Sequence, residues 1–457
     1  MRTRHLLGFC LVSILLASLG TALLPAQEAT WKAGAARAKI TPEEPLWMAG
    51  FAARDHPAEG TLHDVWIKVL ALEDGGGRRA VVITSDVCGF SKTSYEWICA
   101  ELKRRCNLDR DRVMLTYSHT HTGPALRECL VDYYPMDDDQ RAANDRYTLA
   151  LEKTIVQKAA EALSQMTPAT LWAGEATTDF AVNRRNNREA EVPEILERGE
   201  KLQGPVDHSV PVLVVRTPEG SPRAALFAYA CHTSTLSLYQ WSGDYGGFAQ
   251  IALEESRPGM QAMFSMGCGA DQNALPRRKV ELCEKYGRML AGAVEDVLRK
   301  PPRQLAPTLQ TRFAFVDLDF EHTMTREDLE GYASKGGLYG RWAKRMLEQL
   351  EQGATFAQSY PYAIQVWKLG ADQLWISLAG EPVVDYALTF RAKYGPTTWT
   401  VGFAHDLTAY IPSRRVWEEG GYEGGALGEY GLPAMRWAPD VEDRITACVE
   451  RLVAGLE

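Results

Sequence analysis

Short apolar runs alternate with amphipathic stretches along most of this chain, a pattern typical of an α/β layered domain. The apolar runs predict strands at residues 65–73, 79–86, 112–118, 211–217, 224–231, 261–266, 308–318, 362–369 and 374–379. The amphipathic stretches predict helices at residues 92–105, 142–165, 245–256, 279–298, 326–335, 340–352 and 382–394. The acidic run at residues 137–139 is interpreted as a solvated loop tip. No internal repeat or linker divides the chain, so we expect one large domain.

The first thirty residues have a different character. A basic start is followed by an apolar stretch over residues 6–24, and Ala22 and Ala26 suit a signal-peptidase site. We therefore predict a signal peptide at residues 1–28, a mature domain over residues 29–457, and export to the periplasm or the medium. An uncleaved segment that anchors the protein is the alternative, because residues 6–24 are barely long enough to span a bilayer.

Composition and cysteine spacing argue against two classes of function, nucleic-acid binding and cysteine-rich metal binding. The chain is 46% apolar and 24% charged, with a net charge of −9, so it is an ordinary globular protein without the basic surface that nucleic acid requires. The cysteines form no CxxC pair, and Cys88, Cys231 and Cys268 lie in apolar, strand-like sequence. We expect these three to be buried free thiols and not metal ligands.

Histidines follow two of the predicted strands. His119 and His121 stand in the block SHTHTGP at residues 118–124, and His232 follows the apolar run that ends near residue 231. If the strand continues, alternation places both members of the HxH pair on one face. Strand ends are where α/β sheets collect ligands, and imidazoles with a carboxylate suit a catalytic Zn²⁺. On spacing alone, a metal site and ordinary hydrogen-bonded histidines both stay open.

Several further blocks occur in a fixed order along the chain. They are ARAKITP at residues 36–42, SD at 85–86, VNR at 182–184, DHSVPV at 207–212, SGD at 242–244, GE at 380–381, and the tyrosines Tyr410 and Tyr422. Together with the histidine blocks, they make the chain resemble the neutral (non-lysosomal) ceramidases, in their N-terminal zinc-amidase domain, from about residue 33 to about residue 425. The resemblance implies layered mixed β-sheets with flanking helices, as in the neutral ceramidase catalytic domain.

The resemblance also implies one Zn²⁺ per chain. Its ligands would be His119, His232, Glu381 and Tyr410. The activity implied is that of a zinc-dependent amidohydrolase that cleaves an N-acyl amide, with a metal-bound water as the nucleophile. Ceramide or a related sphingolipid is a candidate substrate.

The implied catalytic residues are His121, Arg184, Tyr422 and Asn273. His121 would handle the proton of the attacking water, whereas Arg184 and Tyr422 would hold the substrate carbonyl or the oxyanion. Asn273 stands where the ceramidases carry a catalytic serine, and an amide side chain cannot serve as the nucleophile. We also expect no C-terminal immunoglobulin-like domain of the kind that full-length ceramidases carry.

The asparagine in place of the serine and the expected lack of the immunoglobulin-like domain put the ceramide substrate in question more than the zinc chemistry. The alternatives are a zinc hydrolase of a non-sphingolipid amide or ester, and a non-catalytic secreted binding protein on the same scaffold. The expected partner is a small-molecule or lipid amide, with peripheral contact to a membrane where the substrate is a lipid. The oligomeric state stays open.

Overall fold

The structure is a computed structural model of the 457-residue chain that describes residues 30–300 and 302–456. The predicted signal peptide, and with it the alternative of a retained anchor, lies outside the described residues. Among the helices of the described ranges, none combines the length and the apolar character needed to cross a membrane.

A 13-stranded mixed sheet organises the part of the chain that the structure describes. The strand order is β11 (Gln261–Met266), β9 (Pro222–Tyr229), β8 (Ser209–Arg216), β6 (Thr167–Thr177), β1 (Trp31–Lys39), β3 (Trp66–Glu73), β4 (Arg79–Ser85), β5 (Val113–Tyr117), β18 (Trp399–Ala404), β16 (Gln373–Ala379), β15 (Ser359–Leu369) and β14 (Leu309–Asp319). The short strand β13 (Arg303–Leu305) pairs with β6. Neighbours β9 and β11, β4 and β5, and β16 and β18 run parallel, whereas most other pairs run antiparallel.

This sheet folds over on itself. Strand β11, at one end of the strand order, contacts β4, β5 and β18 from the other half. Between the halves lies a core cluster that includes Trp31, Met263, Trp367, Trp375 and Trp399. Burial of these large side chains stabilises the folded sheet, since a fully buried apolar side chain contributes about 1.5–3 kcal/mol.

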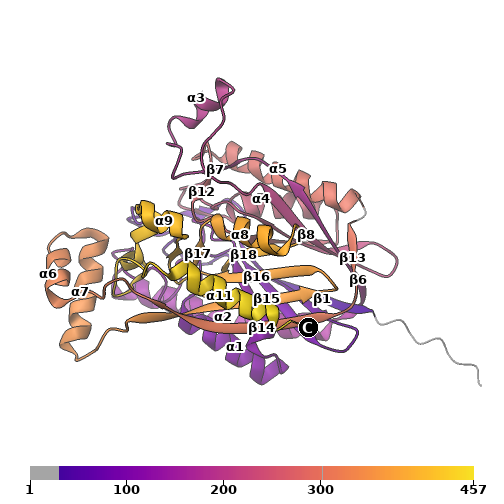
Figure 1. The fold of residues 1–457 in the computed structure, drawn as a ribbon, viewed down its shortest axis with the longest axis horizontal. Coiled ribbons are helices and arrows are strands. Elements are labelled where there is room, and N and C mark those ends of the chain that lie inside the picture. Colours follow the sequence, from indigo (N-terminus) through magenta and orange to yellow (C-terminus); the bar gives the residue numbers. More distant parts are fainter. Residues whose placement is uncertain (1–29, 301, 457) are drawn as a thin grey trace, which may run out of the picture.

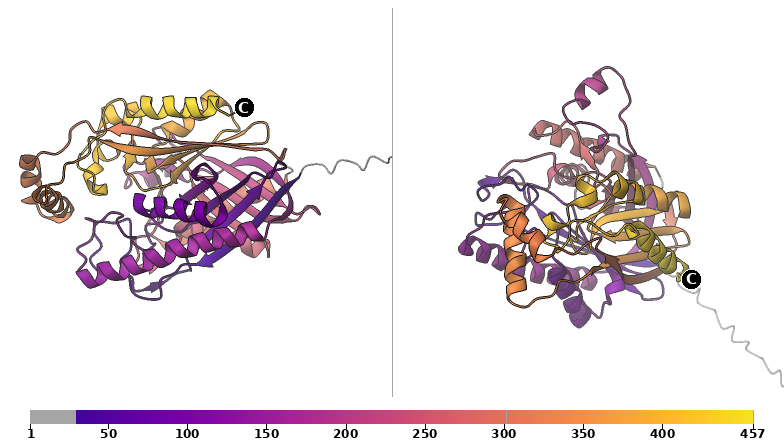
Figure 2. Two further views of the ribbon diagram at one scale, coloured as in Figure 1. Left: turned by 90° about the horizontal axis from the view of Figure 1, so that it is seen from below. Right: turned by 60° about the vertical axis from the view of Figure 1, so that its left-hand side comes forward.

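Helices cover the outer faces of both halves (Figures 1 and 2). On one side, α4 (Asp244–Ser256) and α5 (Val280–Arg299) pack together and cover β11, β8 and β6. On the other, α1 (Lys92–Cys106) packs on α2 (Asp138–Ser164), which covers β1 and β3. Helix α11 (Val441–Ala454) covers β14 and β15, and α8 (Asp385–Tyr394) contacts β18. The expected α/β fold of layered mixed sheets with flanking helices is confirmed.

Two pieces stand out from this body. Helices α6 (Arg326–Ala333) and α7 (Gly337–Glu351) form a hairpin with a small core around Trp342, at the left of Figure 1. Helix α3 (Val192–Glu197) lies in the long segment between β7 (Ala181–Asn183) and β8, at the top of the same view. The remaining short elements are β2 (Gly60–Thr61), β10 (Gln240–Trp241), β12 (Gln272–Ala274), β17 (Glu381–Pro382), β19 (Tyr410–Ile411), α9 (Arg414–Glu419), α10 (Tyr422–Gly425), and the 3₁₀ turns η1 (Arg110–Arg112) and η2 (Leu427–Tyr430).

The acidic run at residues 137–139 is not a loop tip, so that prediction is wrong. Asp137 caps α2: its carboxylate accepts the backbone N–H of Gln140 at 2.8 Å, and the Gln140 side chain accepts the N–H of Asp137 at 3.1 Å. Carboxylates at this position satisfy free N–H groups and complement the helix dipole, so α2 begins well before residue 142. The prediction of buried free thiols is confirmed for Cys88, Cys231 and Cys268. Cys88, however, lies with His119 and His121 in a group that could hold a metal ion, so its exclusion as a metal ligand stays a prediction.

Candidate functional site

The candidate metal ligands come from the ends of three strands. His119 lies just beyond β5, His232 just beyond β9, and Glu381 just beyond β16. Strands β5 and β18 are antiparallel but pair only at Thr116 and Ala404, near the end of each strand. The segments that leave β5, β16 and β18 therefore emerge at one place, and the folded sheet brings the end of β9 to the same place.

There His119, His232 and Glu381 form a fully buried cluster. Oxygen Oε2 of Glu381 lies 3.3 Å from Nε2 of His119 and 3.3 Å from Nε2 of His232. Two ligand atoms that each lie about 2.1 Å from a tetrahedral zinc ion are about 3.4 Å apart. The three side chains thus have the spacing of ligands to one ion.

Hydrogen bonds to the backbone orient both imidazoles. Nδ1 of His119 lies 2.6 Å from the carbonyl oxygen of Cys88, and Nδ1 of His232 lies 2.8 Å from that of Gly269. A ring nitrogen that faces a carbonyl oxygen carries the proton, so in the neutral form of each ring Nε2 presents its lone pair to the cluster. Nε2 of His232 and Oε2 of Glu381 have no hydrogen-bond partner among the described residues. This donor set fits a metal ion.

The charges of the cluster favour a cation as well. Burial opposes a charge on His119, yet Cys88 and Glu381 raise its pKa well above the ordinary value. Burial also opposes the charge of Glu381, but His119 and His232 lower the pKa of that carboxyl well below its usual range. Burial lowers the pKa of His232 to about 4, which keeps the ring neutral, as a ligand must be. Positive charge beside Glu381 therefore stabilises its carboxylate, and a cation held by the three side chains would do the same.

Tyr410 lies beside this carboxylate. Strands β17 and β19 pair in parallel with Glu381 opposite Tyr410, and the phenol oxygen accepts a hydrogen bond from Nη2 of Arg184 at 2.9 Å. Gly380 makes this approach possible, because its φ is +62° and a Cβ there would lie 2.5 Å from the carbonyl oxygen of Ala409. The structure thus places Tyr410, which the resemblance implies as a ligand, next to Glu381.

His121 faces the cluster without belonging to it. Its ring centroid lies 4.9 Å from that of His119 and 5.6 Å from that of His232, and neither of its ring nitrogens has a partner among the described residues. Burial, followed by the charge of His119, lowers the pKa of His121 well below its ordinary value. The strand does not continue through the pair as expected: β5 ends at Tyr117, and His119 has a φ of 55°. A turn, and not strand alternation, brings the two rings together.

Two residues that the sequence reasoning missed shape this arrangement. Gly50 has a φ of +94°, and a Cβ there would lie 2.2 Å from Cγ of His121, so only glycine leaves room for the ring. Tyr430 donates a hydrogen bond from its hydroxyl to Oε1 of Glu381 at 2.6 Å, which leaves Oε2 for the imidazoles. Neither residue stands in a motif that could have identified it.

The other implied catalytic residues gather at the mouth of the site. Arg184 donates from Nε to Glu423 at 2.8 Å and from Nη1 to Oδ1 of Asn273 at 3.4 Å. Asn273 reaches the site because β12 pairs with β7 and forms a bridge to His232. The ring of Tyr422 lies edge-on to that of Tyr410 at 5.1 Å, whereas its hydroxyl donates to Glu429 at 2.9 Å.

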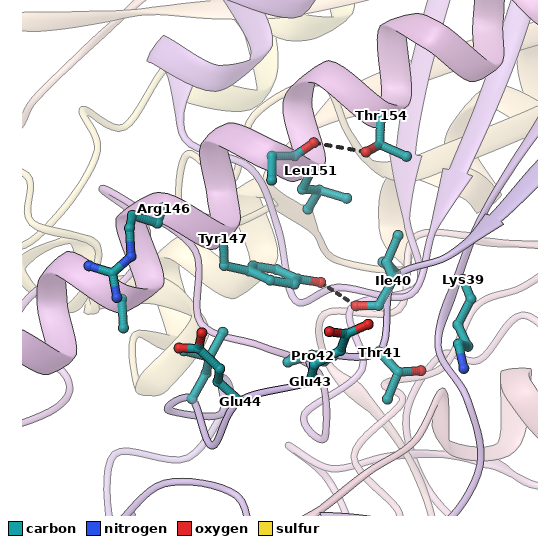
Figure 3. A pocket seen from close by; sticks show the side chains of 13 residues that line it. Lys39, Ile40, Thr41, Pro42, Glu43, Glu44, Arg146, Tyr147, Leu151 and Thr154 are labelled. Atoms are coloured by element: carbon teal, nitrogen blue, oxygen red, sulfur yellow. Dashed lines mark hydrogen bonds between the residues drawn. The ribbon is translucent and has the colours of Figure 1, made fainter.

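A cavity of about 530 Å³ opens at this mouth and is lined by Arg184, Asn273 and Tyr422, among others. A separate cavity of about 330 Å³ lies between α2 and the segment after β1 (Figure 3). In it, the hydroxyl of Tyr147 donates to the carbonyl oxygen of Ile40. The second cavity has none of the predicted site residues in its lining. The chemistry is therefore expected at the first.

Comparisons with known proteins agree with this picture. The family model "Neutral/alkaline non-lysosomal ceramidase, N-terminal" matches residues 31–274, whereas no curated protein matches the chain. Among solved structures, the neutral ceramidase from Pseudomonas aeruginosa superposes with a TM-score of 0.71 at 18% identity, over 93% of this chain and 75% of that one. A ceramidase complexed with C2 gives a TM-score of 0.70 at 17% identity, over 93% and 76%. At these identities the likeness shows the fold. Because the family model covers more than half of the chain, the chain belongs to the neutral/alkaline non-lysosomal ceramidase family.

Proposed function

We propose that this chain is a zinc-dependent amidase that hydrolyses the N-acyl bond of a lipid amide. The observation that carries the proposal is the buried cluster of His119, His232 and Glu381, in which unpartnered ligand atoms converge. Membership of the ceramidase family supports amide hydrolysis as the reaction and a lipid amide as the substrate class.

His119, His232 and Glu381 would hold the ion, with Tyr410 as a fourth ligand. A bound Zn²⁺ supplies Lewis-acid polarisation of the amide carbonyl and a lowered pKa for a coordinated water. The protonated Nδ1 atoms of both histidines and the hydroxyl of Tyr430 would keep the donor atoms aimed at the ion. A phenol ligand is consistent with the site, since a cation in a dry environment favours the phenolate.

His121 would act as the proton acceptor. Its ring is buried and neutral, and both nitrogens are available to the attacking water and then to the departing amine. The backbone N–H of His121 donates to Thr233 at 3.0 Å, and its carbonyl oxygen accepts from Arg54 at 2.9 Å, so the residue is held from both sides. A base fixed beside the candidate ligands would be placed to take a proton from an attacking water there.

Arg184 would stabilise the oxyanion. Its guanidinium remains charged, because Tyr410 and Glu423 offset the effect of burial and raise its pKa well above the ordinary value. A donor already aimed at developing negative charge contributes about 3–4 kcal/mol to the transition state. Asn273, which accepts from Arg184, would orient the substrate or the guanidinium, since its amide provides no nucleophile.

Hydrolysis assays with a substrate panel test this proposal. Zinc-loaded protein is given short- and long-chain fluorogenic ceramides, N-acyl amino acids and simple esters, with and without a chelator. We expect amide turnover that the chelator abolishes and zinc restores. Chelator-sensitive turnover of esters alone would favour a different zinc hydrolase, and no turnover of any compound would favour a binding protein on this scaffold.

A further inference from the structure

The cavity at the mouth of the site is rich in arginine. Its charged lining residues are Arg184, Arg185, Arg188 and Arg277 on the positive side and Glu189 and Glu423 on the negative side, which leaves an excess of two positive charges. The chain as a whole carries a net charge of −9. The positive cavity is thus a local feature, built by the segments that flank β7 and β12.

Part of this charge is held in place by carboxylates. Arg184 and Arg185 share Glu423, at 2.8 Å and 2.6 Å, and Glu423 is buried. Arg277 donates to Glu189 from Nε at 2.9 Å and from Nη2 at 2.7 Å. These pairs hold the guanidiniums of Arg184, Arg185 and Arg277 in fixed positions.

Two arginines are held less firmly than these. The side chain of Arg188 is 85% exposed, and its ion pair is a 3.4 Å contact with Glu191. Arg278 follows the cavity-lining Arg277 in the chain without lining the cavity itself. It makes no ion pair within the described residues, and its guanidinium lies 4.9 Å from the centroid of the Phe51 ring. Phe51 packs edge-on against His121, with 4.7 Å between ring centroids. One aromatic ring therefore separates the Arg278 guanidinium from the proposed base.

We propose that Arg188 and Arg278, here called the arginine rim, bind an oxyanion on the substrate. A guanidinium binds carboxylate, sulfonate or phosphate oxygens through paired, charge-assisted hydrogen bonds, whereas a neutral hydroxylated headgroup leaves its charge uncompensated. The acyl half of an N-acyl amide is apolar, so the oxyanion belongs to the amine half. The substrate class is an N-acyl amide whose amine half is anionic, such as an N-acyl amino acid. This inference rests on the proposed amidase function.

Matched substrates test the arginine rim. N-octanoylglycine and N-octanoylglycinamide differ in one charge, and we expect kcat/KM to be at least about 10-fold higher for the anionic compound. Arg188→Gln and Arg278→Gln should each reduce that preference by roughly 10-fold, as expected from loss of a hydrogen bond to a charged group. Arg288→Gln is the matched control: this arginine on α5 is also exposed and also has a 3.4 Å ion pair, with Glu284, and the preference should stay as in the wild type.

A binding measurement separates this inference from the proposed function. Calorimetry on the His121→Ala protein compares the two octanoyl compounds, together with N-octanoyltaurine and an N-octanoylated phosphoethanolamine, to show which oxyanion is preferred. Tighter binding of an anionic compound that Arg278→Gln weakens supports the arginine rim even where no compound is hydrolysed, and only the amidase proposal then falls. Equal binding of charged and neutral compounds, or a preference that both rim variants leave unchanged, overturns the inference.

Discussion

Removal of one hydroxyl group, in Tyr430→Phe, should weaken zinc binding without removing a ligand. The Tyr430 hydroxyl donates to Oε1 of Glu381 at 2.6 Å, while Oε2 faces the imidazoles of His119 and His232. The variant leaves one oxygen of a buried carboxylate without its donor, and a hydrogen bond to a charged group contributes about 1.5–3 kcal/mol. That energy corresponds to roughly 10- to 100-fold in an equilibrium constant, the range typical for loss of a group that orients a metal ligand.

Zinc affinity is measured by competition with a chromophoric chelator, on protein first stripped of metal. Tyr147→Phe is the control, because its hydroxyl donates to the carbonyl oxygen of Ile40 in the cavity of Figure 3, whose lining contains none of the metal-ligand residues. We expect wild-type affinity from the control and a 10- to 100-fold loss from Tyr430→Phe. Equal zinc affinity in all three proteins would refute the reasoning that Tyr430 orients Glu381 for the ion.

Three further predictions concern the base, the asparagine and the metal. Gly50→Ala should abolish most activity because its Cβ would lie 2.2 Å from the His121 ring, whereas Gly77→Ala, at a φ of +83° with open space around it, should lower stability without this loss of activity; similar activity in both would contradict the steric argument. Asn273→Ala should reduce kcat/KM by about 10- to 100-fold, and a covalent acyl-enzyme trapped by mass spectrometry would exclude the proposed role of Asn273. Chelation should lower the melting temperature, because the ion binds the folded state; an unchanged value would argue against a tightly bound metal.

Secondary structure could be predicted from the sequence where apolar residues recur with a clear helical or strand period. Strand β11 matches the predicted residues 261–266, and α5 (Val280–Arg299) closely follows the predicted helix, since its buried residues recur at helical spacing. Strand β1 (Trp31–Lys39) was missed because its sequence, WKAGAARAK, consists largely of small and charged residues. Its pairing with β3 and β6 compensates for a weak intrinsic preference, and such pairing is not visible in a local pattern.

The residues of the candidate site likewise fall into those that local sequence identifies and those that it does not. Spacing alone identified His119, His121 and His232 as a group worth testing. Glu381 and Tyr410 came from the family resemblance, because they meet the histidines only through the folded sheet and the pairing of β17 with β19. Contacts of this kind depend on topology, which no window of sequence contains.

The central claim is that this chain binds one zinc ion through His119, His232 and Glu381 and uses His121 for proton transfer. Elemental analysis of the purified wild type and of two histidine variants tests it most directly. We expect about one zinc per chain in the wild type and in His121→Ala, which should be inactive, and a near-complete loss of zinc in His232→Ala. Loss of zinc from His121→Ala as complete as from His232→Ala, or a wild type without bound metal, would contradict the account.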